Sequence, residues 1–280
     1  MTHLTALADA RTLLFVPGNR PERYDKAVSS GADAIVLDLE DAVPLADKAQ
    51  AREHMQVAWP RLMAAGVPVV VRINMLGQFL GEEDVQWLAR MPVPAGVMVP
   101  KAESAESLRR LRSQLPDVPI LPLIESAAGL GALTEIASAE GVLRLVLGHI
   151  DFMADTGILC SEDEVELASL RFAIAMATRG QMLATAVEGV TVAIQDDDLL
   201  RRDTRRALNF GFGAKLCIHP RQVAVVHQAV APTAAEVDWA RRVVAADADA
   251  GGAAVQIDGR MVDRPVVLQA RSTLAHADRP

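Results

Sequence analysis

Two acidic residues in this 280-residue chain stand where they could hold a metal ion. Glu125 ends the apolar run 119–126, and Asp151 ends the next apolar run, 143–151. If the two runs are neighbouring strands about 4.8 Å apart, both carboxylates can reach one cation. Mg²⁺ is usually held by a few carboxylates together with water and substrate oxygens. We therefore expect a Mg²⁺ site here, in which the ion polarises a substrate carbonyl or stabilises an enolate.

Two basic residues follow other apolar runs and offer an alternative role for the acids. Arg72 could bind a carboxylate or the oxygens of a thioester and a keto acid through its planar fork. It could equally pair with the acidic cluster at 38–41, whose carboxylates would then hold Arg72 and Lys101 in place. Lys101 could form a Schiff base in a metal-free aldolase, or it could pair with strand-end acids. Glu125 and Asp151 could likewise pair with these bases or cap helices.

Further polar residues have weaker signals. Arg20, Arg23 and Lys26 flank the start of a predicted helix, and a basic helix N-terminus can receive a phosphate group. His219 could act as a base or a hydrogen-bond donor, or it could be a structural histidine. Glu188 ends another run and has no role that the sequence alone decides.

Eight apolar runs position these residues, and stretches of helical length separate them. The runs are rich in Val, Ile and Leu on successive positions, which is typical of strands buried on both faces of a parallel sheet. Eight strands alternating with helices predict an α/β (β/α)₈ TIM barrel, whose reactive groups lie at the carboxyl ends of the strands. The runs are 12–20, 34–41, 67–74, 95–103, 119–126, 143–151, 182–189 and 214–220.

The stretches between the runs carry signals for helix ends. Asn19, followed by a proline, predicts an N-cap. Ser104 opens a predicted helix over 104–115. The segment 161–180 has acids in its first turn and Arg-Gly at its end, which predicts another helix.

The end of the chain lies outside the eightfold alternation. We expect residues 1–230 to form the barrel and residues 231–280 to form a helical and lid extension. The extension contains a helical stretch at 233–248 and the dipeptide Asp258-Gly259, which predicts a tight turn.

Composition limits the classes of function. The formal net charge is −8 and the pI is near 5.3, which argues against a nucleic-acid partner. Cys160 and Cys217 form neither a disulfide framework nor a zinc pattern. There is no apolar stretch of about 18 residues and no signal-peptide layout at the N-terminus. We therefore expect a cytoplasmic enzyme that does not associate with membranes.

Seven motifs, in order between about residues 11 and 275, carry a family resemblance. They are RTLLFVPGNRPER, IVLDLEDAVP, VVVRIN, VMVPKAES, LPLIESAAGL, LVLGHIDFMADTG and GFGAKLCIHPRQVAVV. Together they resemble the citrate lyase β-subunit-like proteins of the HpcH/HpaI aldolase superfamily. The resemblance implies a TIM barrel that cleaves or forms carbon–carbon bonds in 3-hydroxy-acid thioesters such as malyl, citramalyl and citryl thioesters.

The resemblance also implies roles for individual residues. Glu125 and Asp151 would hold Mg²⁺, and Arg72 would bind the acyl or keto-acid oxygens. The coenzyme A carrier would be contacted by Phe15, Arg20, Lys26 and the backbone around Ile218 and His219, with the basic pair facing its phosphates.

The segment GRMVDRPVV (259–267) resembles the C-terminal lid of coenzyme A-dependent lyases. In these lyases an aspartate, here Asp263, reaches the active site of a neighbouring subunit as the acid or base. Without the resemblance, Asp263 would be interpreted as a turn residue. The lid implies a homo-oligomer, a trimer or a hexamer, that acts on a coenzyme A thioester and a 2-keto acid.

One motif departs from the family pattern, and other functions stay open. Relatives usually have Gly-x-Glu-Asp where this chain has GHID (148–151), so an apolar residue replaces the acid before Asp151. The alternatives are a citrate lyase β subunit acting on an acyl-carrier-protein thioester, the Schiff-base aldolase, and a barrel that binds thioesters or keto acids without turnover.

Overall fold

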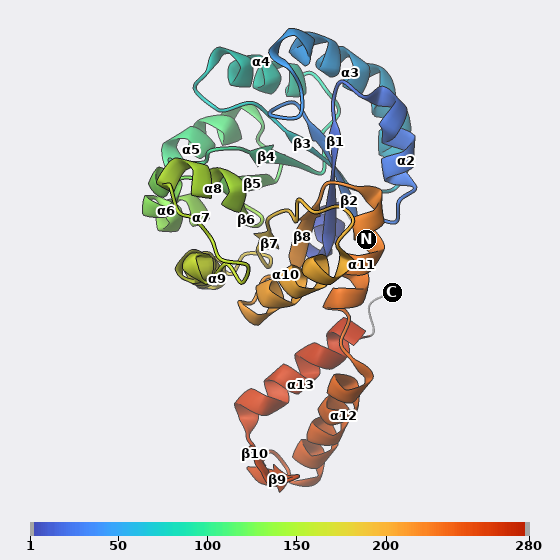
Figure 1. Cartoon of the computed structure of the whole chain (residues 1–280), viewed down its shortest axis with the longest axis vertical. Helices are drawn as coiled ribbons and strands as arrows, with labels where there is room; N and C mark the ends of the chain where they lie inside the picture. The colour runs from blue at the N-terminus through green and yellow to red at the C-terminus, as the bar shows by residue number, and fades with distance from the viewer. Residues whose placement is uncertain (1–2, 278–280) are drawn as a thin grey trace. The chain divides into compact units, whose positions relative to one another are not determined.

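Eight parallel strands close into a barrel in chain order, with β1 paired to β8 (Figure 1). The structure is a computed structural model and describes residues 3–277. The predicted (β/α)₈ TIM barrel is confirmed. The strands are β1 Thr12–Pro17, β2 Ala34–Asp38, β3 Val69–Arg72, β4 Gly96–Val99, β5 Ile120–Ile124, β6 Val146–Leu147, β7 Val187–Glu188 and β8 Ala214–Cys217.

Helices surround the barrel and cover the outer faces of its strands (Figure 1). They are α2 Tyr24–Val28, α3 Lys48–Ala64, α4 Phe79–Leu88, α5 Ala105–Gln114, α6 Ala127–Gly131, α7 Leu133–Ala137, α8 His149–Thr156, α9 Ala168–Gly180, α10 Asp197–Asn209 and α11 Pro220–Val230, with 3₁₀ turns η1 Pro21–Arg23, η2 Leu45–Asp47 and η3 Val165–Leu167.

The barrel interior is filled by aliphatic side chains. Val36, Val70, Met98 and Leu121 come from four consecutive strands and are fully buried in one cluster. Most strand residues are buried on both faces of the sheet, as the continuous apolar runs predicted. This interior is a packed core that holds the strand ends at fixed positions.

The N-terminal helix α1 (His3–Asp9), which the sequence pattern did not predict, packs at the amino-terminal ends of the strands. Its Leu7 joins the barrel core cluster. Arg144, which is fully buried just before β6, donates hydrogen bonds of 2.9 Å to the carbonyl oxygens of Leu7 and Ala10. It also donates to the Thr185 carbonyl at 2.8 Å. Burial lowers the pKa of Arg144 to about 10.

Several predicted element ends are confirmed, and others are wrong. Ser104 caps α5 by accepting hydrogen bonds from two backbone amides. Asn19 is not an N-cap, because its side chain donates to Asp47 instead. The helix predicted over 161–180 begins late, because Glu164 has a left-handed backbone with φ 47° and α9 starts only at Ala168.

The chain folds as two compact units, and the boundary between them falls between His227 and Gln228, within α11. The second unit contains α12 Ala234–Asp249, β9 Val255–Ile257, β10 Arg260–Val262 and α13 Arg264–Ala277. Its own small core contains Ala240, Val243, Val262, Val267 and Ala270.

The helix and the tight turn predicted in the second unit are confirmed. Thr233 and Glu236 form a reciprocal capping box at the start of α12. Asp258 and Gly259 both have positive φ between the antiparallel strands β9 and β10, as a two-residue hairpin turn requires. Within residues 3–277, no helix combines the length and the apolar character needed to cross a bilayer.

Candidate active site

A cavity of about 650 Å³ lies at the carboxyl ends of the barrel strands. This is the end at which TIM-barrel enzymes carry their active sites. Seven residues predicted from the sequence line this cavity together: Phe15, Lys26, Arg72, Glu125, Asp151, Ile218 and His219. Two predicted residues do not: Arg20 is not a lining residue, and Asp263 belongs to the second unit.

Glu125 directly follows β5 and is 3% exposed. The backbone N–H of Lys101 donates to its Oε1 at 2.6 Å. A Cβ on Gly148 would lie 2.6 Å from Glu125 Oε2, so the missing side chain of Gly148 makes room for this carboxylate. Burial and the nearby negative charge of Asp151 raise the pKa of Glu125 to about 8. Ionisation of Glu125 beside Asp151 is therefore unfavourable in this cavity.

Asp151 lies in the first turn of α8, rather than at the end of a strand as the run 143–151 suggested. The helix start brings it to the same cavity as Glu125. Within residues 3–277, no cluster of three or more His, Cys, Asp or Glu could hold a metal. Two hard oxygen donors beside an open cavity fit Mg²⁺, which keeps several water or substrate ligands, and they do not fit a closed structural metal site.

Arg72 pairs with the acidic cluster at 38–41 and also lines the cavity. Its Nε and Nη2 donate to the two oxygens of Asp38 at 2.7 and 2.6 Å, and its Nη1 lies 2.9 Å from Glu40 Oε2. Its guanidinium carbon lies 4.8 Å from the centre of the Phe15 ring. Burial opposes the charge of Arg72, but the two acids more than offset it, so the pKa of Arg72 is raised. A fixed positive charge therefore faces the cavity.

Lys101 is an ion-pair partner. Its Nζ lies 3.2 Å from Glu40 Oε1, and its backbone has a left-handed φ of 46°. Partial burial opposes its charge, but Glu40 and Glu125 outweigh this effect and raise the pKa of Lys101. A protonated lysine is not a nucleophile, so this environment disfavours the Schiff-base alternative.

The basic residues at the cavity differ from the predicted pair. Lys26 lines the cavity together with Arg23. Arg20 instead donates from Nε to Glu22 at 2.6 Å, and its side chain is about half exposed. The sequence places Arg23 near the start of the helix but does not assign it to the site, because the turn η1 sets which basic side chain faces the strand ends.

The loop between β8 and α11 supplies Ile218 and His219, and β8 is the barrel neighbour of β1. The Ile218 backbone N–H donates to Gln222 Oε1 at 2.8 Å. His219 Nδ1 accepts from the backbone N–H of Arg221 at 3.1 Å, so this ring is oriented by its own loop.

His149 is a cavity residue that sequence analysis did not identify as a site residue. It is 4% exposed and begins α8 directly after Gly148. The departure of the GHID segment from the family pattern was the available signal.

Asp263 immediately precedes α13, where its carbonyl accepts from the backbone N–H of Val267 at 3.0 Å.

Comparison with known proteins gives consistent matches over the chain. A family model described as HpcH/HpaI aldolase/citrate lyase matches residues 11–220. The citrate lyase subunit beta-like protein of Deinococcus radiodurans is 36% identical over 277 residues, which cover 95% of this chain and 96% of that protein. A (3S)-malyl-CoA thioesterase of Cereibacter sphaeroides is 30% identical over 271 residues, covering 96% and 94%.

Among solved structures, CitE from Mycobacterium tuberculosis, in complex with magnesium, acetoacetate and coenzyme A, matches with a TM-score of 0.85. The sequence identity is 33%, and the match covers 97% of this chain and 100% of the other.

Proposed function

The chain belongs to the HpcH/HpaI aldolase/citrate lyase family, and we propose that it is a Mg²⁺-dependent carbon–carbon lyase. Its substrate would be a 3-hydroxy-acid coenzyme A thioester of the malyl, citramalyl or citryl type, and its products an acyl-CoA and a 2-keto acid. The observation that carries this proposal is the pair Glu125 and Asp151 in one cavity with Arg72. The magnesium, acetoacetate and coenzyme A bound by the CitE relative support it.

Glu125 and Asp151 would hold the ion, which supplies Lewis-acid polarisation of the keto-acid oxygens when bound. In cleavage the proton of the C3 hydroxyl passes to the carboxylate of Asp263, and the adjacent carbon–carbon bond breaks. The acyl-CoA leaves as an enolate, whose negative charge Arg72 stabilises. Asp38 and Glu40 keep that guanidinium charged and oriented. Asp263, from a neighbouring subunit of a trimer or hexamer, then donates a proton to the enolate carbon.

The carrier would lie along the cavity wall formed by Phe15, Lys26, Ile218 and His219. The geometry favours Arg23 over Arg20 as the second basic residue near the phosphates, because Arg23 lines the cavity and Arg20 pairs with Glu22.

A thioesterase is the second candidate, and the Cereibacter sphaeroides relative is the observation that favours it. In that reaction water would attack the thioester carbonyl and release the hydroxy acid and free coenzyme A. The same cavity could serve both reactions, since hydrolysis also develops negative charge on a thioester oxygen.

One assay separates these functions. Malyl-, citramalyl- and citryl-CoA, and the same acyl groups on an acyl carrier protein, are incubated with the protein in Mg²⁺ or in EDTA. Mass spectrometry of the products then distinguishes acyl-CoA with keto acid from free coenzyme A with hydroxy acid. We expect lyase products that disappear in EDTA and in Glu125→Gln. Equal turnover in EDTA would overturn the metal-dependent mechanism, and turnover only on the protein carrier would identify a citrate lyase β subunit.

A further inference from the structure

The four-residue segment Gly148–Asp151 packs against Glu125, contains the second proposed metal ligand, Asp151, and contacts the end of β7 through His149. Gly148 packs against the carboxylate of Glu125, where an added Cβ would lie 2.6 Å from Oε2. Asp151 lies close enough to raise the pKa of Glu125 by its charge. His149, between them, turns to the neighbouring strand end. The placement of this segment therefore sets how the two proposed metal ligands face each other.

Few backbone hydrogen bonds between β6 and β7 hold this segment in place. Within the described chain, β6 and β7 are each two residues long and pair at one position, Val146 with Val187. By contrast, β1 and β2 pair over five positions. Side chains must therefore supply much of the restraint between α8 and β7.

His149 makes this connection. A Cβ on Gly189 would lie 2.2 Å from His149 Nδ1, so the ring occupies space that only a glycine leaves open after β7. His149 Nδ1 is buried and has no hydrogen-bond partner among the described residues. On its other side, His149 Nε2 lies 3.9 Å from Glu164 Oε1. A carboxylate facing Nε2 favours the tautomer with the proton on that nitrogen.

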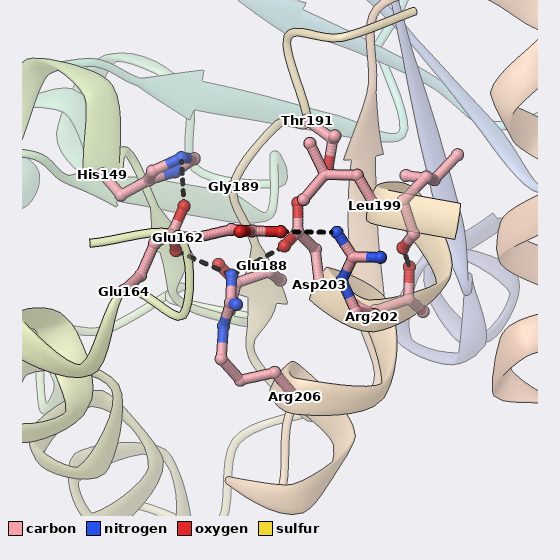
Figure 2. A network of polar contacts seen from close by, with 12 residues as sticks. His149, Glu162, Glu164, Glu188, Gly189, Thr191, Leu199, Arg202, Asp203 and Arg206 are labelled. Atoms are coloured by element: carbon pink, nitrogen blue, oxygen red, sulfur yellow. Dashed lines mark hydrogen bonds and ion pairs between the residues drawn. The ribbon is translucent and has the colours of Figure 1, made fainter. Parts of the chain in front are cut away.

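Glu164 is itself held by two arginines, of which Arg206 is labelled in Figure 2. Its Oε2 accepts from Arg171 Nη2 and, at 2.8 Å, from Arg206 Nη2. Arg171 is 1% exposed and also donates to both oxygens of the buried Glu188, at the end of β7. Glu164 therefore joins the His149 ring to α9, α10 and β7. The backbone at Glu164 is left-handed, with φ 47°, which is uncommon for a residue with a side chain.

We propose that His149 and Glu164 are positioning residues of the Mg²⁺ site, which fix the first turn of α8 so that Asp151 faces Glu125. The inference rests on the proposed function, because it assigns the network a purpose toward the metal. Groups that orient metal ligands typically change metal affinity about 10- to 100-fold when they are removed.

The test is the affinity of the full-length protein for Mn²⁺, a spectroscopic substitute for Mg²⁺, measured by electron paramagnetic resonance without substrate. Glu164→Gln keeps the shape and removes the charge, and we expect it to raise the Mn²⁺ Kd about 10-fold. Glu162→Gln is the matched control. It makes the same change two residues away, in an exposed ion pair with Arg202 that does not contact His149 (Figure 2). We expect wild-type affinity there.

A second pair of variants keeps the test decisive if Glu164→Gln does not fold. His149→Gln can place an amide donor near the position of Nε2, whereas His149→Phe fills the same space with no donor. We expect near-normal Mn²⁺ affinity in the first and an affinity at least about 10-fold weaker in the second, with the same Tm in both. Equal affinity in wild type, Glu164→Gln and His149→Phe overturns the positioning role. No Mn²⁺ binding by the wild type overturns the metal site itself, and with it the proposed function.

Discussion

Glu125 illustrates a conflict between stability and function within one side chain. Burial and the negative charge of Asp151 raise the pKa of Glu125 to about 8, so an ionised carboxylate is unfavourable in the metal-free fold. Metal binding requires the ionised form. The residue best suited to hold a cation is therefore one that the empty protein tolerates poorly.

Replacing Glu125 with Gln should stabilise the metal-free protein at alkaline pH. The folded pKa of about 8 lies above the unfolded value, so the contribution of Glu125 to stability is complete below pH 4.5 and is lost as the pH rises to 8. At pH 9 in EDTA, Glu125→Gln should increase the free energy of unfolding by a few kcal/mol at most, since one pKa unit corresponds to about 1.4 kcal/mol.

Urea denaturation of the wild type and the variant at pH 4.5 and pH 9 measures this effect. The exposed Glu53→Gln is the control and should show the same difference from wild type at both pH values. A Glu125→Gln effect that does not change between the two pH values would contradict the buried environment of this carboxylate.

Asp263 is the second residue for which a single substitution is informative. If it donates the proton to the enolate, Asp263→Asn should lower kcat about 10²- to 10⁴-fold and leave thioester binding near normal. Asp238→Asn, at an exposed aspartate of the same unit, should have wild-type kinetics. Unchanged turnover in Asp263→Asn would contradict the catalytic role and leave Asp263 as a turn residue before α13.

At the scale of elements, the sequence predicted the strands well and the helix starts less well. Runs of branched residues specify strands buried on both faces, so the eight-strand order and the strand-end position of Glu125 could be predicted. The sequence did not show that the run 143–151 ends as a strand at Leu147 and becomes a helix at His149. That change depends on contacts with Glu125 and Gly189, which lie far away in the chain.

The same reason explains why the sequence did not show which residues lie in or near the cavity. Arg20 and Arg23 are the same residue type and lie three positions apart, so the sequence does not distinguish them. The 3₁₀ turn η1 directs Arg23 to the cavity. Glu164 lies in a segment with helical character, yet it takes a left-handed backbone because two arginines and His149 surround its carboxylate. Local propensity cannot anticipate such long-range pairing.

The start of α8 offers a prediction at this scale. A Cβ in Gly148→Ala would meet Glu125 Cβ and Oε2 at 2.6 Å, so either the helix start or the carboxylate must move. We expect at least about a 10-fold loss of Mg²⁺ affinity, as when a group that orients a metal ligand is removed. Isothermal titration calorimetry measures it.

Gly131→Ala is the matched control for this variant. Gly131 is exposed at the end of α6, and an added Cβ meets no other atom within 4 Å. We expect unchanged Mg²⁺ affinity there and a stability equal to or slightly above wild type. Normal affinity in Gly148→Ala would show that the helix start tolerates displacement.

At the scale of the whole molecule, the proposed acid lies in a different compact unit from the proposed metal ligands. The second unit has its own small core, so it can present Asp263 from a stable element. Such a division suits an oligomer in which one chain completes the site of another.

Mixed oligomers test this arrangement. Asp263→Asn and Glu125→Gln subunits should each be nearly inactive alone. They are co-expressed and purified through two different tags, which removes oligomers of a single variant. If subunits associate at random in a closed ring, lyase activity should return at about a third of the sites in a trimer and about a quarter in a six-membered ring. Separately purified variants mixed without exchange of subunits are the control. Mixed oligomers as inactive as the single variants would place Asp263 in the site of its own chain.

The hydrogen bonds from Arg144 to the carbonyls of Leu7 and Ala10 span more than 130 positions of the chain. During synthesis on the ribosome, α1 is made before β1, but its buried arginine partner emerges only after five strands have been translated. These hydrogen bonds therefore form late, and the final docking of α1 cannot precede the synthesis of more than half of the barrel.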